Sequence, residues 1–214
     1  MAAACPLCGA AGAAELTGPD ARRYHDCDAC GLVFVDRACL PTPTDELAQY
    51  RLHQNDPDDL RYRAFLRPLA DALVGKLEAG AEGLDFGCGP GPALRPMLAD
   101  AGFAMRDYDP FFAPDAAALA RRYDFVACTE VVEHFHDPAA GFRTLAGLLR
   151  PGGWLGVMTL ILGDATDFGR WSYARDPTHV AFYRPRTLAW IAARHGWRLE
   201  SDGVRLALFQ SAFD

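Results

Sequence analysis

Four cysteines near the N-terminus form two matched pairs, Cys5-x-x-Cys8 and Cys27-x-x-Cys30, with 18 residues between the pairs. The two-residue gap lets both sulfur atoms of a pair face one ion, and this spacing is typical of a four-thiolate zinc site. We therefore predict that Cys5, Cys8, Cys27 and Cys30 bind Zn²⁺ within a small zinc ribbon over residues 1–40. Two chance pairs or a redox thiol pair are the alternatives.

A second group of residues suited to chemistry lies at 84–91, in the sequence LDFGCGPG. The segment has the pattern of a buried strand, an acidic residue and a turn with three glycines, followed by a proline that suits a helix start. Glycine has no Cβ, so the backbone of such a turn can contact a ligand. The pattern predicts a nucleotide-like ligand across this loop.

Short apolar strands alternate with helices from residue 83 onwards, which predicts a mainly parallel sheet with helices on both faces. We expect a helix from Asp58 or Asp59 to about Gly80, and residues 41–59 before it have the composition of a linker. The remaining expectations are strands at 83–86, 103–108, 125–129 and 154–159, helices at 92–100, 138–149 and 186–195, and a closing hairpin at 197–209.

The 214 residues carry a formal net charge of −7, and half of them are apolar. This balance disfavours nucleic acid as the main partner, because that binding depends on clustered Lys and Arg. No apolar run is long enough to cross a bilayer, and the N-terminus lacks the pattern of a secretory signal. We expect a cytoplasmic protein without a membrane partner, and we assign no oligomeric state.

Four segments, in order, resemble the class I S-adenosylmethionine-dependent methyltransferases: residues 84–91, 108–110, 124–134 and 148–153. The loop at 176–183 is similar to the substrate-side segment of ubiquinone-biosynthesis-type O-methyltransferases. This resemblance covers about residues 60–214 and implies a Rossmann-like α/β methyltransferase domain there. Only 13 residues separate Asp109 from Tyr123, too few for a further strand and its helices. We therefore expect the outer third strand of the family to be missing.

The resemblance also implies S-adenosylmethionine as the cofactor. Asp85 would interact with its methionine amino group, and Asp109 would accept the ribose hydroxyls, although either aspartate alone could simply form a turn. Phe111 or Phe112 could face the adenine ring or pack in the core. The full set of expected cofactor contacts is Asp85, Gly87, Cys88, Gly89, Gly91, Asp109, Pro110, Thr129 and Glu130.

Two histidines are the candidate catalytic bases, because imidazole accepts protons near neutral pH. His134 follows the strand at 125–129, and His179 lies in the long loop after the strand at 154–159. A helix cap and a loop contact are their structural alternatives. We expect the remaining histidines at the surface: His25, His53, His136 and His195. The aromatic residues around the loop suggest either a lid over an apolar acceptor or packing of the loop onto the sheet: Trp171, Tyr173, Phe182 and Tyr183.

The leading hypothesis is therefore a zinc-containing enzyme that methylates an oxygen or carbon of a small molecule. One alternative is an rRNA-type methyltransferase that uses the ribbon to recognise RNA, although residues 1–40 hold more acidic than basic groups. The other alternative is a non-catalytic scaffold that keeps the fold, which the complete glycine loop disfavours.

Overall fold

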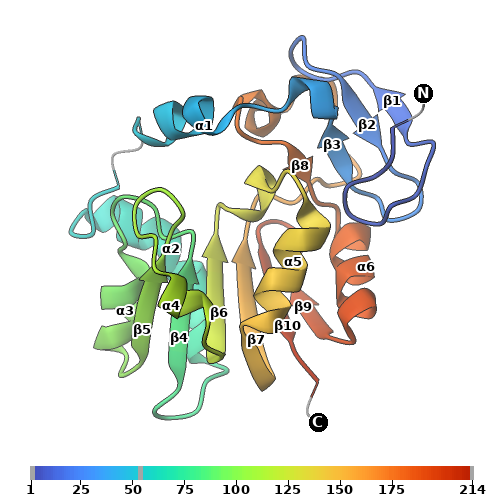
Figure 1. The fold of residues 1–214 in the computed structure, drawn as a ribbon. Coiled ribbons are helices and arrows are strands. Elements are labelled where there is room, and N and C mark those ends of the chain that lie inside the picture. The colour runs from blue at the N-terminus through green and yellow to red at the C-terminus, as the bar shows by residue number, and fades with distance from the viewer. Residues whose placement is uncertain (1–2, 53–54, 213–214) are drawn as a thin grey trace.

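The structure is a computed structural model that describes residues 3–52 and 55–212. Two sheets organise the chain, and both are visible in Figure 1. The larger sheet has six strands in the order β5-β4-β6-β7-β10-β9, and the smaller one has four in the order β1-β2-β3-β8. The strands are β1 (Ala14–Leu16), β2 (Tyr24–Asp26), β3 (Val33–Val35), β4 (Glu82–Phe86), β5 (Ala104–Tyr108), β6 (Tyr123–Thr129), β7 (Leu149–Met158), β8 (Ala181–Phe182), β9 (Arg198–Ser201) and β10 (Leu206–Gln210).

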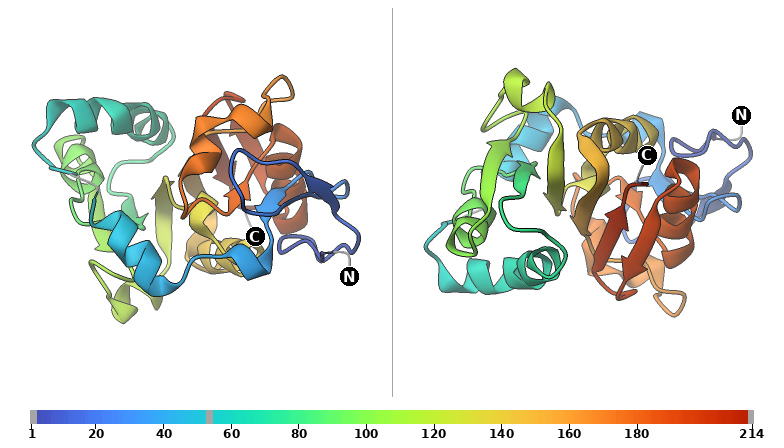
Figure 2. Two further views of the ribbon diagram at one scale, coloured as in Figure 1. Left: turned by 90° about the horizontal axis from the view of Figure 1, so that it is seen from above. Right: turned by 90° about the horizontal axis from the view of Figure 1, so that it is seen from below.

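The α-helices cover both faces of the larger sheet, as the two end-on views of Figure 2 show. Helices α2 and α3 pack on one face, and α5 and α6 pack on the other. The α-helices are α1 (Pro43–Tyr50), α2 (Leu60–Val74), α3 (Leu94–Asp100), α4 (Ala116–Leu119), α5 (Pro138–Gly147) and α6 (Pro185–His195), and the 3₁₀ helices are η1 (Arg37–Cys39), η2 (Val132–His134), η3 (Phe168–Arg170) and η4 (Ser172–Arg175).

The larger sheet has the predicted mixed α/β architecture. Strands β5, β4, β6 and β7 are parallel, while β10 pairs antiparallel with both β7 and β9. Strand β5 lies at the edge, and within residues 3–52 and 55–212 no strand pairs with its outer side. The chain between β5 and β6 contains only the four-residue helix α4. The prediction that the outer third strand is missing is therefore confirmed.

Local capping signals explain several helix boundaries. The Asp137 carboxylate accepts a hydrogen bond from the Ala140 amide at 2.8 Å and so caps the start of α5. The Asp59 carboxylate caps α2 in the same way through the Arg61 amide. Gly196 ends α6 in the left-handed conformation, with φ of 67°. Helix α2 ends at Val74, earlier than the predicted stop at Gly80.

The segment 41–59, predicted as a linker, contains helix α1. Thr42 and Asp45 form a capping box at its start, in which each side chain bonds the other residue's backbone amide. The sequence Thr42-Pro43-Thr44-Asp45 carries this helix signal, although the helix is only eight residues long. Helix α1 bridges the two sheets at the top of the molecule in Figure 1.

The ribbon and the larger sheet share one apolar core. Buried Leu7 and Leu32 of the ribbon belong to the same cluster as Phe142 of α5 and Leu188 of α6. The smaller sheet also takes its fourth strand, β8, from the C-terminal half of the chain, through the pairs Val33↔Phe182 and Phe34↔Ala181. Strands β2 and β3 of the ribbon pair antiparallel next to it. Strand pairing therefore crosses the predicted boundary between the ribbon and the rest of the chain.

Candidate functional site

A cavity of about 790 Å³ opens beyond the carboxyl ends of β4, β5 and β6. Ligands of open parallel sheets bind at this position, and the volume is in the usual range for a small-molecule site. Its walls are formed by residues 86–90, 108–112, 129–131 and 134–137, by Glu46, Tyr50, Asn55, Tyr62 and Phe65, and by Gly141, Asp176 and His179.

The glycine loop after β4 forms the floor of this cavity. Gly87 and Gly89 have φ values of 82° and 65°, which side-chain-bearing residues rarely adopt. The amides of Gly87 and Cys88 donate hydrogen bonds to the Tyr108 carbonyl and tie the loop to the end of β5. A Cβ on Gly89 would meet only the Asn55 side chain, at 3.8 Å, so the loop backbone stays accessible to a ligand.

Gly91 has a different role in this structure. A Cβ on it would lie 1.7 Å from the backbone oxygen of Asn55, so the residue allows the chain before α2 to pack on the loop. Gly91 does not line the cavity, whereas Gly87, Cys88 and Gly89 do. Its expected cofactor contact stays a prediction from sequence.

Asp109 lies at the end of β5 and lines the cavity, as expected. Its Oδ2 accepts a hydrogen bond from the Gly89 amide at 3.0 Å, and its Oδ1 accepts from Phe111 and Phe112 at 2.8 and 3.0 Å. The carboxylate therefore both forms a turn and joins the two loops. A carboxylate has about four acceptor positions, so roughly one stays available for a ribose hydroxyl. Phe111 and Phe112 line the cavity, where either ring could face adenine.

Asp85 lies below the glycine loop and is 4% exposed. Burial, with the nearby charges of Asp107 and Asp109, raises the pKa of its carboxyl to about 8. Asp85 does not line the cavity directly. A cationic group above the loop, such as an amino group, would favour its ionised form.

Strand β6 delivers two further predicted contacts, Thr129 and Glu130, to the cavity wall. Glu130 has φ of 50° and is the one non-glycine residue with positive φ among residues 3–52 and 55–212. Such backbone strain is concentrated at functional sites. Thr129 Oγ1 and Glu130 Oε1 are buried, and neither has a hydrogen-bond partner within the described chain. Buried polar atoms are normally paired, so these two are candidates for ligand contacts.

Glu130 and the fully buried Glu133 form a carboxylate pair held by Tyr173. The Tyr173 hydroxyl contacts Glu133 Oε1 at 2.6 Å, Glu130 Oε2 at 3.1 Å and the Thr159 hydroxyl at 3.0 Å. Burial raises the pKa of both carboxyl groups, and repulsion from Glu133 adds to the effect on Glu130. This role of Tyr173 has no signal in the sequence, because the residue lies 40 positions from Glu133.

His134 and His179, the predicted bases, meet at the cavity wall with ring centroids 4.8 Å apart. Nδ1 of His134 lies 3.0 Å from the Thr178 carbonyl, and Nδ1 of His179 lies 2.7 Å from the Tyr173 carbonyl. A carbonyl can only accept, so each Nδ1 carries a hydrogen and each neutral ring keeps Nε2 as its proton acceptor. Burial lowers the pKa of both rings, that of His179 to about 4.

The same cluster could hold a divalent cation. Glu133, His134 and His179 offer ligand atoms that all lie within 4.8 Å of one another. Glu133 Oε2 is buried and has no hydrogen-bond partner in the described part of the chain. Carboxylate oxygen and imidazole nitrogen are common ligands of divalent metals.

Helix α1 contributes a wall of the cavity that the sequence analysis missed. Glu46 and Tyr50 line the cavity, and the Tyr50 ring packs edge-on against His134. Glu46 Oε1 lies 3.2 Å from Nε2 of His136, whose side chain is 33% exposed and also lines the cavity.

The prediction of a surface position is wrong for His25. His25 is buried and its Nε2 lies 2.9 Å from Asp36, because strand β2 turns it into the ribbon. His53 lies outside the described residues. The aromatic rings around the His179 loop pack rather than cover the cavity: Trp171 and Phe182 contact the buried ring of Phe168, beside the ribbon.

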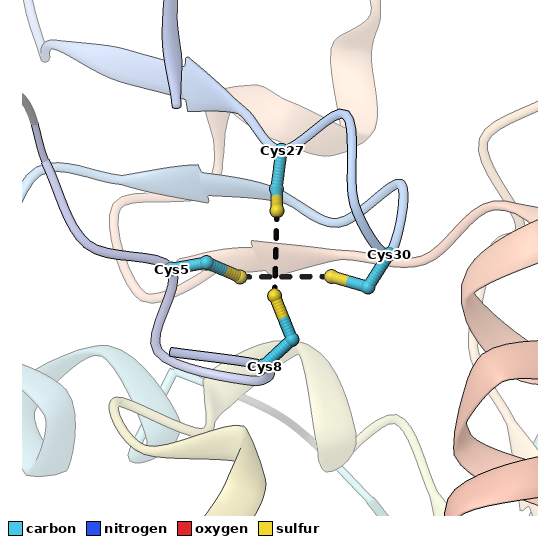
Figure 3. Close-up of side chains that lie close together, drawn as sticks. All are labelled: Cys5, Cys8, Cys27 and Cys30. Carbon is cyan, nitrogen blue, oxygen red and sulfur yellow. Dashed lines mark hydrogen bonds between the residues drawn. The ribbon is translucent and has the colours of Figure 1, made fainter. Parts of the chain in front are cut away.

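The four N-terminal cysteines converge on one point (Figure 3). The Sγ atoms of Cys5 and Cys30 are 3.6 Å apart, and those of Cys8 and Cys27 are 3.5 Å apart. A tetrahedral site with Zn–S bonds of about 2.3 Å places its sulfur atoms about 3.8 Å apart, so the donor set fits Zn²⁺. The Cys30 thiol and nearby amides lower the pKa of Cys5 to about 5, which favours a thiolate ligand.

The turns that hold these thiols depend on glycine. Gly9 and Gly31 follow the two cysteine pairs with φ of 76° and 79°. Their amides donate to the carbonyls of Cys5 and Cys27, which closes each turn at 2.9 and 2.7 Å. Both features agree with the sequence-based expectation for a zinc ribbon.

Comparison with known proteins places this geometry in a family. A family model described as "Methyltransferase domain" matches residues 58–202. The ubiquinone biosynthesis O-methyltransferase of Thiobacillus denitrificans is 37% identical over 93 residues, 43% of this chain and 39% of that protein. Its counterpart from Leptothrix cholodnii is 30% identical over 141 residues, 54% of this chain and 57% of that protein. The matches thus span about half the length of these relatives.

Solved structures share the fold at low identity. A Burkholderia thailandensis 1,6-didemethyltoxoflavin-N1-methyltransferase is 18% identical, with a TM-score of 0.58 over 94% of this chain and 100% of that one. The [4+2]-cyclase SpnF is 13% identical, with a TM-score of 0.51 over 82% of this chain and 98% of that one. Because this protein is named for a different reaction, likeness of fold alone does not assign chemistry. No helix within residues 3–52 and 55–212 has the length and apolar character needed to span a membrane.

Proposed function

This chain belongs to the methyltransferase domain family, and from that premise we propose that it transfers a methyl group from S-adenosylmethionine to an oxygen of a small molecule. The observation that carries the proposal is the pair of neutral histidines, His134 and His179, at the cavity wall beside the glycine loop. The named O-methyltransferase activity of the relatives supports the same assignment. Carbon is the less favoured acceptor atom.

The residues present suit the cofactor. We propose that Gly87, Cys88 and Gly89 contact the cofactor through their backbone. Asp109 accepts a hydrogen bond from a ribose hydroxyl. The carboxylate of Asp85, below the loop, attracts the ammonium group of the cofactor. Thr129 and Glu130 offer buried oxygen atoms without partners in the described chain. Gly91 and Pro110 complete the predicted set. When bound, the cofactor supplies an electrophilic methyl group on a sulfonium.

The reaction needs alignment, exclusion of water and removal of one proton. The acceptor oxygen forms the new C–O bond as the S–CH₃ bond breaks, and the bonding electron pair stays on sulfur. Nε2 of His134 or His179 takes the hydroxyl proton. Their lowered pKa values keep both rings neutral, and so able to accept it, at neutral pH.

Charge in the cavity indicates the acceptor class. Its lining contains carboxylates but no Lys or Arg among the described residues. The lining carboxylates are Glu46, Asp109, Glu130, Asp137 and Asp176. Such a site disfavours anionic acceptors. We propose a neutral or cationic acceptor with an aromatic or other apolar body, because aromatic rings make up much of the rest of the wall.

The RNA alternative is less favoured. Two of the three ribbon arginines pair with carboxylates at short distances: Arg22 with Asp20 at 2.9 Å and Arg23 with Asp36 at 2.9 Å. Arg184, which lies against the ribbon, binds both oxygens of Asp26 at 2.7 Å. These pairs reduce the positive surface that a phosphate backbone requires. We propose that the ribbon binds Zn²⁺ for structural reasons.

The test is a methyl-transfer assay with labelled S-adenosylmethionine and matched neutral, amine-bearing and carboxylate-bearing phenols. We expect transfer to the first two classes, and at least tenfold less to the third. His134→Gln and His179→Gln should lower kcat by about 10²–10⁴-fold while cofactor binding, followed by thermal shift, persists. His195→Gln is the matched control, because its ring stacks on Trp197 outside the cavity. Wild-type kcat in both cavity variants would refute the assignment.

The same assay, repeated after treatment with a chelator, shows whether the histidine cluster acts as a general base or holds a divalent cation. A divalent cation bound by Glu133, His134 and His179 would supply Lewis-acid polarisation of the acceptor hydroxyl. Activity that persists after a chelator has removed weakly held cations, with zinc content unchanged, supports the base. Activity that disappears and returns with Mg²⁺ or Mn²⁺ assigns the cluster to the cation.

A further inference from the structure

Arg22 of the ribbon reaches into the loop that carries His179. Its Nη1 donates hydrogen bonds to the carbonyls of Pro177 at 3.1 Å and His179 at 3.0 Å. Its Nη2 donates to the carbonyl of Ala174 at 2.5 Å. One guanidinium therefore binds three backbone carbonyls of a segment more than 150 residues away in sequence.

The guanidinium is held in place from its own side by Asp20. Nε and Nη2 of Arg22 contact Asp20 Oδ2 at 3.0 and 2.9 Å, and the Arg22 amide donates to Oδ1 at 2.9 Å. The Tyr24 hydroxyl contacts both Asp20 and the Ala174 carbonyl. The Arg22 side chain is 15% exposed and that of Asp20 is 32% exposed, so the ion pair is only partly open to water. Asp20 therefore holds the planar guanidinium group in the orientation that its hydrogen bonds to the loop require.

The loop around His179 is irregular, and other hydrogen bonds hold the residues on either side of it. The Thr178 carbonyl accepts from His134 Nδ1 at 3.0 Å, and the Val180 amide donates to the Glu133 carbonyl at 2.8 Å. Residues 163–180 contain only two short 3₁₀ helices, and the pairing of β3 with β8 begins at residue 181. Carbonyls of buried irregular backbone need hydrogen-bond donors, and Arg22 donates to those of the buried residues Ala174 and His179. The His179 ring is then fixed from the other direction by the bond between its Nδ1 and the Tyr173 carbonyl.

We propose that Arg22 is a positioning residue: it fixes the backbone of residues 174–179 so that the His179 imidazole stands beside His134 at the cavity. This inference rests on the proposed function for its catalytic meaning. The ribbon thereby supports one wall of the active site through a long-range arginine contact. The ribbon then contributes to methyl transfer without touching the acceptor.

The experiment compares Arg22→Met and Arg22→Lys with Arg23→Met. Arg23 is the matched control, because it removes the same charge one residue away and its side chain is 56% exposed beside Asp36. Zinc content and cofactor affinity should stay within about twofold of wild type in all three variants. We expect kcat to fall about 10–100-fold in both Arg22 variants with KM changed less than threefold, since small misplacements of reacting groups are costly. Lysine should not rescue, because one ammonium cannot reproduce the fork.

Hydrogen–deuterium exchange on peptides covering residues 172–180 provides a readout that is independent of activity. Exchange should accelerate at least tenfold in both Arg22 variants and stay at the wild-type rate in Arg23→Met. Unchanged exchange and unchanged kcat in Arg22→Met would overturn the inference. If wild-type protein methylates no acceptor, the proposed function fails, and the exchange data still decide whether Arg22 positions the loop.

Discussion

At the scale of single residues, burial favours the neutral form of both the carboxyl groups and the imidazole rings of the site. Asp85, Glu130 and Glu133 all have raised pKa values, while those of His134 and His179 are lowered. In each case burial is the largest cause, because it disfavours the charged form. Ionisation of these carboxyl groups is therefore unfavourable in the ligand-free protein, and a cationic ligand would make it more favourable.

Asp85 allows a direct test of this electrostatic view. Its folded pKa of about 8 exceeds the ordinary value of about 3.9, so between these values the native state binds a proton that the unfolded state releases. The free energy of unfolding of the ligand-free protein should therefore decrease as pH rises through this window, by up to about 1.4 kcal/mol per pH unit for this one group.

Urea unfolding at pH 5 to 8 measures this slope. Asp85→Asn should flatten it, whereas Asp58→Asn, which removes an exposed carboxylate before α2, should leave it as in wild type. Equal slopes in Asp85→Asn and wild type would show that Asp85 is ionised throughout.

At the scale of elements, the glycine loop is a packing surface as well as a ligand surface. Gly87 and Gly89 adopt the positive φ angles that the loop requires, and Gly91 leaves room for the Asn55 carbonyl. Asn55, which precedes α2, is thereby held on the loop and lines the same cavity as α1. One motif thus sets both the floor and a rim of the site.

Gly91→Ala should expose this second role. The added methyl group would overlap the Asn55 carbonyl, and we expect a loss of about 1–3 kcal/mol of stability together with weaker cofactor binding. Denaturant unfolding and a thermal-shift titration with S-adenosylmethionine measure the two effects.

Gly75→Ala is the control. Gly75 has φ of −67° and only ordinary contacts at 3.6 Å, so the change should be neutral or stabilise by less than about 1 kcal/mol. If Gly91→Ala behaved like Gly75→Ala, the packing of Asn55 on the loop would not matter.

At the scale of the whole molecule, we expect the ribbon and the larger sheet to unfold as one cooperative unit. They share an apolar core cluster, strand β8 completes the ribbon sheet, and Arg184 donates to both Asp26 and the Gly31 carbonyl. A ribbon of this size buries too little apolar surface to fold without a metal. Loss of zinc should therefore affect the entire chain.

Cys27→Ser tests this expectation. We expect zinc content to fall from one per chain to near zero, stability to drop by more than about 3 kcal/mol, and unfolding to remain a single transition. Cys39→Ser removes a cysteine outside the tetrad and should keep its zinc. Calorimetry combined with metal analysis measures both. A separate early transition, with the main one at the wild-type temperature, would contradict the shared core.

Local sequence patterns determined the elements that carry chemistry in this protein. Glycines with positive φ, paired cysteines and capping aspartates act within a few residues, so the glycine loop, the zinc ribbon, the strand–helix alternation and the missing outer strand were predictable from the chain. His134 and His179 were also predictable as candidates, because His134 follows one predicted strand and His179 lies in the loop after another.

Tertiary structure alone decided which distant segments meet. The pairing of β3 with β8, the reach of Arg22 to the His179 loop, the bridge from Tyr173 to Glu130 and the wall built by α1 join residues about 40 to 160 positions apart. Such contacts depend on how apolar faces pack and on which buried carbonyls need donors, and neither has a fixed spacing in sequence.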